Sequence, residues 1–155
     1  MWQSTRLYLS IEVMKYRKSN HSIYKTEYHI VWIPRFRRKI FVKGVKAYME
    51  ELLFHFPNLQ SDIVVIASNV QLDHIHLVLC IPPRVAVARV VSFLKSQSSK
   101  RLKAKYAFLH KVYWDGGGVW SRGYCVSTIG INEKQILDYV RYQEKEDGGQ
   151  LELEL

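Results

Sequence analysis

Asp73-His74-Ile75-His76-Leu77-Val78-Leu79-Cys80 is the stretch around which this sequence is organised. Its alternation predicts a β-strand, in which side chains two residues apart point to the same face. His74 and His76 would then project side by side from a stiff support, and neutral imidazole is the commonest metal ligand in proteins. The opposite face would carry the apolar side chains that hold the strand in a core, Ile75, Leu77 and Leu79. An isolated pair of this kind is more often an ordinary structural feature, so its meaning depends on the rest of the chain.

The surrounding sequence predicts an α+β domain built on one antiparallel sheet. Apolar residues recur at spacings of three and four in the predicted helices, whereas β-branched and aromatic runs bounded by Pro or Gly predict the strands. A turn at 71–73 should join the histidine strand to the preceding strand as a hairpin. The order β-α-β-β-α-β with an added C-terminal helix is that of the ferredoxin-like or RRM-like fold. The predicted strands are 28–33, 62–70, 74–80 and 124–129, and the predicted helices are 45–56, roughly twenty residues from 87, and 133–146.

One domain is expected between two less patterned ends. Residues 1–21 form a weakly patterned N-terminal extension, 22–147 the domain, and 148–155 an acidic tail in which Leu and Glu alternate. The last helix would begin after the cap residue Asn132 and stop at Gly148-Gly149. Neither end carries a motif, so functional residues are expected within 22–147.

The charge balance points to a polyanionic partner, most simply nucleic acid. The 155 residues carry a formal net charge of +9, and between Arg84 and Lys111 there are eight Lys or Arg and no Asp or Glu. No apolar run is long enough to cross a bilayer, and no secretory leader is evident. The only two cysteines lie far apart in the sequence, as is usual for proteins of a reducing compartment. We therefore expect a cytoplasmic protein without a membrane partner. The predicted DNA-contacting residues are Arg35, Arg37, Arg38 and Lys39 after the first strand, and Lys95, Lys100, Arg101 and Lys103 on the second helix.

The last predicted helix offers a second set of chemical groups. Tyr139 and Gln143 are four residues apart and share a face with the apolar residues Ile136 and Val140. A tyrosine in this setting is usually a core residue. Combined with the histidine strand, however, the face would add an amide oxygen as a metal ligand and a phenol as a nucleophile.

These residues belong to an ordered series that resembles the HUH-type single-tyrosine transposases, which move bacterial and archaeal insertion sequences as single-stranded DNA. HUH stands for histidine, a large hydrophobe and histidine, here at 74–76. The resemblance implies that His74 and His76 bind a divalent metal, that Tyr139 is the nucleophile and that Gln143 completes the metal site. Tyr142 is a rival nucleophile, but it lies about 60° around the helix from Tyr139. The matching motifs, within 22–146, are Tyr28-His29-Ile30-Val31-Trp32, Pro34-Arg35-Phe36-Arg37-Arg38-Lys39, Phe93-Leu94-Lys95, Ser98-Ser99, Trp120-Ser121-Arg122-Gly123-Tyr124, Ser127-Thr128-Ile129-Gly130 and Tyr139-Val140-Arg141-Tyr142-Gln143.

The resemblance also implies an activity and partners. The expected enzyme is a metal-dependent transposase that nicks and rejoins single-stranded DNA at hairpin-bearing ends through a 5′-phosphotyrosine. An amide oxygen beside two imidazoles favours Mg²⁺ or Mn²⁺ as the metal. The family forms homodimers through sheet edges, so Tyr139 of one subunit would complete the His74–His76 site of the other.

Other functions are open on the residues alone. A relative domesticated to process chromosomal repeats would keep the same chemistry. A non-enzymatic RRM-like module would read bases with sheet aromatics such as Tyr28 or Trp32. A histidine-triad hydrolase would need a third histidine where Val78 stands, and a two-motif phosphoesterase would need a second His-x-Ser or His-x-Thr.

Overall fold

The computed structural model describes residues 16–56, 59–128, 130 and 132–154. Residues 1–15 of the expected N-terminal extension, 1–21, therefore lie outside the described residues. The elements in order are β1 Arg17–Lys18, β2 Ile23–Tyr24, β3 Glu27–Trp32, the 3₁₀ turn η2 Arg35–Arg37, α1 Gly44–Phe54, β4 Val64–Val70, β5 Ile75–Cys80, α2 Val87–Lys105, α3 Phe108–Val112, β6 Cys125–Ser127 and α4 Glu133–Glu154.

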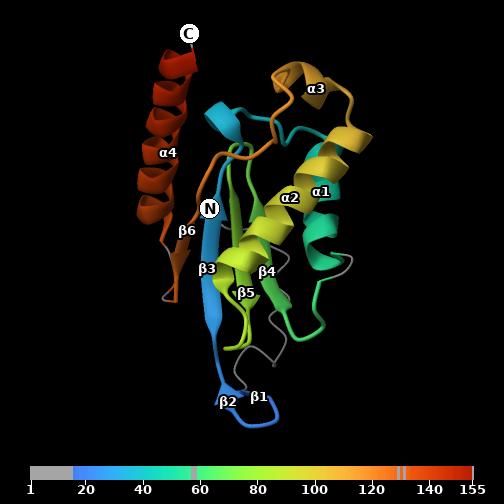
Figure 1. Ribbon diagram of the computed structural model, residues 1–155, viewed down its shortest axis with the longest axis vertical. Helices are drawn as coiled ribbons and strands as arrows, with labels where there is room; N and C mark the ends of the chain where they lie inside the picture. Colours follow the sequence, from blue (N-terminus) through green and yellow to red (C-terminus); the bar gives the residue numbers. More distant parts are fainter. Residues whose placement is uncertain (1–15, 57–58, 129, 131, 155) are drawn as a thin grey trace.

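Four strands form one antiparallel sheet in the order β4-β5-β3-β6. The two strands that are first and third among the predicted four, β3 and β5, are therefore central, which is the ferredoxin-like arrangement and confirms the predicted fold class. β4 and β5 pair as the expected hairpin, with a register shift between Val65 and Ala67. In Figure 1, α1 and α2 lie across the sheet, whereas α4 runs beside β6 and β3.

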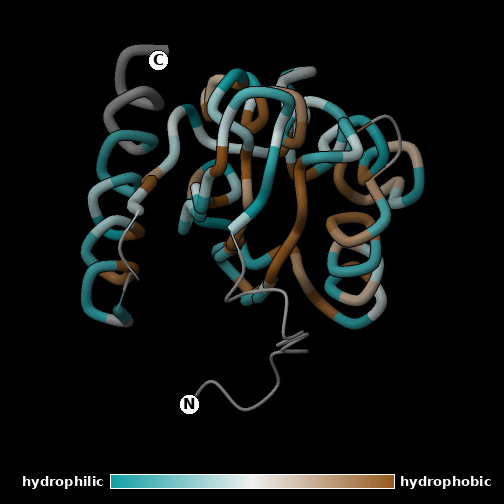
Figure 2. The backbone as a smooth tube through the Cα atoms, turned by 90° about the horizontal axis from the view of Figure 1, so that it is seen from below, coloured by the Kyte–Doolittle hydropathy of each residue, from teal (hydrophilic) through white to brown (hydrophobic). Residues whose placement is uncertain are grey.

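Alternation along the central strands separates two apolar layers. Ile75, Leu77 and Leu79 of β5 are fully buried, as predicted, in the large core that also contains residues of α1 and α2. On β3, Ile30 and Trp32 face the same core, whereas Val31 and the residue after the strand, Ile33, pack on the other side with residues of α4. Figure 2 shows the hydrophobic strands enclosed by the helices, with α4 largely hydrophilic. The sheet face opposite α1 and α2 is thus the one that α4 approaches.

Several predicted boundaries were wrong. α4 does not stop at Gly148-Gly149 but continues to Glu154, because glycine disfavours a helix by only about 1 kcal/mol and the Leu and Glu that follow are strong helix formers. The short hairpin β1–β2 and the helix α3 were not predicted, since both are too short for a periodic pattern. β6 covers three residues of the six predicted.

The helices and the cysteines bear on the expected location of the protein. None of the helices in the described residues combines the length and the apolar character needed to span a bilayer. Both cysteines are free thiols; Cys80 is buried and Cys125 is partly exposed.

Candidate active site

The predicted histidine pair lies at the start of β5. The strand begins at Ile75, so His74 immediately precedes it and His76 is its second residue. His76 lies opposite Val31 of β3 and Asn69 of β4, and cross-strand partners share a face of the sheet. His76 therefore faces the side on which Val31 contacts α4.

His74 is oriented by the residue before it. The Nδ1 of His74 lies 2.9 Å from Oδ1 of Asp73. The pKa of Asp73 is lowered to about 2, first by this hydrogen bond and also by Arg37, while burial opposes the shift. An ionised carboxylate can only accept, so Nδ1 of His74 is the donor, and in the neutral imidazole the lone pair is then on Nε2. This is the tautomer that a metal-binding imidazole requires.

His76 is held neutral by its surroundings. Burial, together with the nearby His29 and His74 rings, lowers the pKa of His76 to about 4. The rings of His29 and His76 have centroids 5.8 Å apart. Sequence reasoning missed His29 as part of this site, because only the pairing register of β3 and β5 brings the two histidines together. The outcome is a deprotonated imidazole at neutral pH, as metal binding needs.

The pKa of His76 predicts a pH-dependent free energy of unfolding in the metal-free protein. Its folded pKa of about 4 lies below the ordinary value of 6.5, so between these values the unfolded state binds more protons. The free energy of unfolding should therefore fall as the pH falls through this window, by up to about 3 kcal/mol from this group. Urea unfolding between about pH 7 and pH 4 measures the loss. His76→Asn should make this loss of unfolding free energy smaller. An equally steep loss in the variant would show that His76 is not its source.

The inner face of α4 carries the second set of predicted residues. Ile136 and Val140 are buried against Val31 of β3 and the following Ile33, and Tyr139 packs partly buried beside them. Gln143 is also buried, with only 7% of its surface exposed. Tyr142 points outward and is 58% exposed. Tyr139 and Gln143 therefore face the sheet, whereas the rival tyrosine faces solvent.

The Tyr139 phenol lies in a poor environment for ionisation. Within the described part of the chain its hydroxyl is buried and has no hydrogen-bond partner. Burial raises the pKa of Tyr139 well above the ordinary value, and Cys125, Asp147 and Tyr142 add to the shift. The free protein thus keeps this group as a neutral phenol.

A network around η2 joins α4 to the histidine turn. Arg37 donates from Nε to Oδ2 of Asp73 (2.8 Å) and from Nη1 to Oε2 of Glu144 (2.8 Å). The backbone N–H of Phe36 donates to Oδ2 of Asp147 (2.9 Å), which also accepts from the Ser121 hydroxyl. These contacts connect the helix that carries Tyr139 and Gln143 with the residue that orients His74.

The side chains at this site that could hold a metal ion are His74, His76 and Gln143. In residues 16–56, 59–128, 130 and 132–154, no group of three or more His, Cys, Asp and Glu side chains is placed to hold a metal. Two neutral imidazoles, with the amide of Gln143 as a third donor, would leave positions for water and phosphate oxygens. Such a set suits Mg²⁺ or Mn²⁺ and not a closed tetrahedral site.

Comparison with known proteins gives this arrangement a family. The profile of the family described as "Transposase IS200 like" matches residues 22–143. The chain belongs to the IS200-like transposases. The resemblance seen in the sequence is thereby confirmed at the level of the family.

Individual relatives of this transposase cover most of its length. It is 30% identical to the ISDra2 transposase TnpA of Deinococcus radiodurans over 131 residues, which are 84% of this chain and 92% of the relative. It is 32% identical to the transposase for insertion sequence element IS200 of Salmonella typhimurium over 127 residues, 82% of each chain. A crystal structure of a candidate transposase from D. radiodurans R1 has the same fold, with a TM-score of 0.71 and 28% identity over 82% of this chain and 97% of that one.

In this transposase the residues predicted to contact DNA fall into two groups. Arg35 pairs with Asp115 (2.6 Å), and Lys95 donates to the carbonyl oxygens of Ser121 (2.7 Å) and Gly123 (2.8 Å). Burial accordingly lowers the pKa of Lys95 to about 8. Four of the eight, Arg35, Arg37, Lys95 and Lys103, bind groups of the protein itself, whereas Arg38, Lys39 and Lys100 are exposed and Arg101 is partly buried.

This division predicts different consequences for matched lysine substitutions. Lys39→Gln or Lys100→Gln should flatten the log–log dependence of single-stranded DNA affinity on salt by about 0.7 for each phosphate that is no longer neutralised, without changing the unfolding temperature. Lys95→Gln should instead lower the unfolding temperature, because two carbonyl oxygens lose their donor. Titrations at several salt concentrations, with thermal unfolding of the same variants, measure both effects. An unchanged salt slope in the Lys39 and Lys100 variants would remove these residues from the DNA-binding surface.

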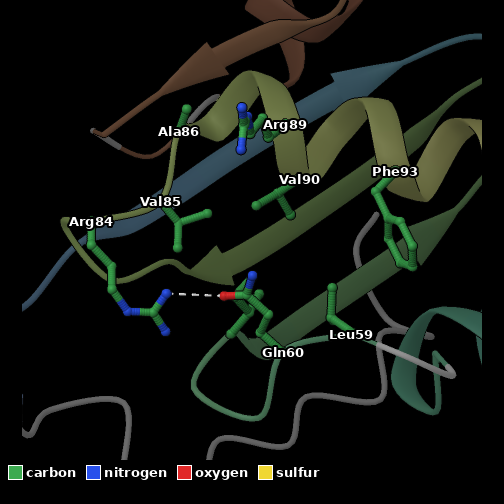
Figure 3. Close-up of a pocket in the computed structure, with 9 residues that line it drawn as sticks. Leu59, Gln60, Arg84, Val85, Ala86, Arg89, Val90 and Phe93 are labelled. Atoms are coloured by element: carbon green, nitrogen blue, oxygen red, sulfur yellow. Dashed lines mark hydrogen bonds between the residues drawn. The ribbon is translucent and has the colours of Figure 1, made fainter.

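A cavity of about 600 Å³ lies apart from this site, where the start of α2 meets the segment before β4. Arg84 at its rim donates to Oε1 of Gln60 (3.1 Å) and pairs with Asp62, so its charge is already neutralised (Figure 3). Val90 of its wall belongs to the core on the α1–α2 side of the sheet, opposite the face of His76. None of the predicted site residues is among its lining residues, Leu59, Gln60, Ile63, Arg84, Val85, Ala86, Arg89, Val90 and Phe93.

Proposed function

We propose that this transposase nicks and rejoins single-stranded DNA at hairpin-bearing insertion-sequence ends, with Tyr139 as nucleophile. The observation that supports it best is the meeting of two groups on one sheet face: the His74–His76 pair at the start of β5, and the Tyr139–Gln143 face of α4 packed on the adjacent β3. Either group alone is common in folded proteins. Their combination in a member of a transposase family is what the proposed chemistry needs.

The proposed metal site consists of His74, His76 and Gln143. Asp73 holds His74 in the tautomer that leaves Nε2 available, and burial keeps His76 deprotonated. A bound Mg²⁺ or Mn²⁺ would supply positive charge beside the scissile phosphate. Gln143 is buried, and its amide oxygen lies near Gly123, 4.0 Å from where a Cβ on that residue would stand.

The proposed covalent step exchanges one phosphodiester bond for another. The Tyr139 phenol gives up its proton and its oxygen bonds to the scissile phosphorus, while the bond to the 3′ oxygen breaks and that oxygen takes up a proton. The products are a 5′-phosphotyrosine and a free 3′ hydroxyl, so attack by a 3′ hydroxyl on the phosphotyrosine rejoins the strand. Because Tyr139 is buried with a raised pKa, we infer that it ionises only after the DNA is bound.

The proposed partners are a single-stranded DNA hairpin and a second copy of the chain. Exposed cations at Arg38, Lys39 and Lys100 supply sequence-independent attraction for the strand. α4 packs against β3 and η2 of its own chain, an arrangement in which one chain supplies both halves of the proposed site. In the proposed homodimer, α4 of the partner would take the same place and supply Tyr139 to the His74–His76 pair.

The alternative of a base-reading RRM-like module is less well supported. Trp32 is fully buried in the α1–α2 core, and Tyr28 packs against the same core. Neither aromatic residue is presented on an open sheet face, as stacking on bases would require.

The test is incubation with a hairpin-bearing single-stranded oligonucleotide and Mg²⁺ or Mn²⁺. A covalent protein–DNA adduct that survives denaturing electrophoresis, together with a free 3′ end, supports the proposal. Tight hairpin binding without any adduct under all metal conditions would contradict the enzymatic function.

A further inference from the structure

Arg37 was predicted from the sequence to contact DNA, yet both of its ion pairs are with carboxylates of its own chain. Its Nε binds Asp73 and its Nη1 binds Glu144, each at 2.8 Å, and 27% of its side chain is exposed. One guanidinium thus faces two carboxylates, and these contacts raise its pKa. Two carboxylates already accept from its Nε and Nη1, so Arg37 is poorly suited to bind a phosphate.

The two carboxylates belong to different parts of the proposed site. Asp73 binds Nδ1 of His74 through its other oxygen, so Arg37 fixes the carboxylate that orients the imidazole. Glu144 directly follows Gln143 on α4. We call the chain of contacts from His74 through Asp73 and Arg37 to Glu144 the Arg37 bridge.

The backbone that presents Arg37 is strained. Phe36 and Arg37 have φ values of 59° and 51°, a left-handed conformation that non-glycine residues rarely adopt. Such a conformation persists only where surrounding contacts determine it. Here the contacts come from α4 and the histidine turn: Asp147 binds the Phe36 N–H, and Asp73 and Glu144 bind the Arg37 side chain.

We propose that Arg37 is a positioning residue that couples the docking of α4 to the orientation of His74. The inference rests on the proposed function of Tyr139, Gln143 and His74. When α4 is docked, Glu144 and Asp147 hold η2 in its strained turn, and Arg37 then holds Asp73 against His74. When α4 leaves, Arg37 loses Glu144, and Asp73 is no longer held against His74. Docking of α4 therefore brings Tyr139 and Gln143 to the site and orients His74 in the same step.

The bridge needs the geometry of arginine and not only its charge. Two separate guanidinium nitrogens bind two separate carboxylates, and a lysine ammonium on a flexible stem does not reproduce that fork. Arg37→Lys keeps the charge that a phosphate contact would use and removes the bridge. Arg38→Lys is the matched control, because Arg38 is the exposed neighbour.

The first measurement needs neither DNA nor metal. The side-chain nitrogen signals of His74 are recorded by NMR in the wild type, in Glu144→Ala and in Glu146→Ala, which removes an exposed charge two residues further along α4. Glu144→Ala is expected to shift or broaden the His74 signals, although Glu144 does not touch His74, whereas Glu146→Ala leaves them in place. Unchanged His74 signals in Glu144→Ala would overturn the coupling, whatever the nucleophile is.

The second experiment measures two quantities on each variant, the rate of adduct formation and the affinity for the DNA hairpin. Arg37→Lys and Glu144→Ala are each expected to slow the reaction by about 10- to 100-fold, as loss of a residue that orients a metal ligand does, with hairpin affinity within about twofold. The double variant should be little slower than either single variant, because both break the same bridge. Wild-type rates in Arg37→Lys, or additive effects in the double variant, would overturn the proposal. An absence of adduct in the wild type would instead refute the proposed function and leave the NMR result to decide the coupling.

Discussion

Tyr139→Phe is expected to abolish both nicking and covalent attachment while hairpin affinity stays within a few-fold. The substitution removes the phenolic oxygen but almost no packing volume, so the apolar contacts with Val31 and Ile33 persist. Loss of a nucleophile can lower turnover on the order of 10⁶-fold. Adduct formation on denaturing gels, with hairpin binding measured in parallel, reports the two effects separately.

The same substitution should leave the protein at least as stable as the wild type. In the described residues the Tyr139 hydroxyl is buried without a hydrogen-bond partner, and burying such a group costs about 1–3 kcal/mol. Urea unfolding of the two proteins measures the change. Tyr142→Phe is the matched control, because Tyr142 lies on the exposed side of α4. If Tyr142→Phe lost the adduct and Tyr139→Phe kept it, the assignment of the nucleophile would be wrong.

His74→Ala and His76→Ala are expected to give the second-largest loss, roughly 10³-fold or more in cleavage, from the several kcal/mol that a bound metal contributes to charge stabilisation. Hairpin recognition should persist, because exposed cations and not the ion supply most of the affinity. Chelation of the wild type with EDTA should have the same effect. Added Mn²⁺ should restore activity at lower concentration than Mg²⁺, since imidazole suits Mn²⁺ better.

The control for the histidine variants is His55→Ala, which removes an exposed histidine at the end of α1. It should keep the activity of the wild type. Cleavage is measured with a labelled hairpin oligonucleotide over a series of metal concentrations. Full activity of His74→Ala or His76→Ala in EDTA-treated buffer would refute a metal-dependent mechanism.

Local patterns in the sequence were enough for the fold and for the side of the sheet on which chemistry is expected. The period of two in 74–80 predicted Ile75, Leu77 and Leu79 in the core and His76 on the opposite face, as the structure confirms. The helical spacing of Ile136, Tyr139, Val140 and Gln143 likewise predicted one shared inner face. These outcomes depend only on backbone geometry, which is the same in every strand and helix.

The charged residues were harder to interpret, because a basic side chain does not show in the sequence what it faces. Lys95 and Arg37 were predicted to contact DNA, yet Lys95 binds the loop at 121–123 and Arg37 binds two carboxylates. Their acceptors are carbonyl oxygens or acids from distant segments. Net charge correctly indicated a class of partner, but it could not assign single residues.

The sequence by itself determined the order of the four sheet strands and three long helices, the α+β class, the two faces of the histidine strand and membership of the transposase family. The tertiary structure alone decided that His29 lies beside His76, that Asp147 holds the η2 turn, and that Arg37 links Asp73 to Glu144, 36 and 107 residues away along the chain. The physical reason is that periodicity acts over a few neighbouring residues. Contacts between distant segments depend on strand register and on how α4 docks, and many different sequences between those segments would allow the same docking.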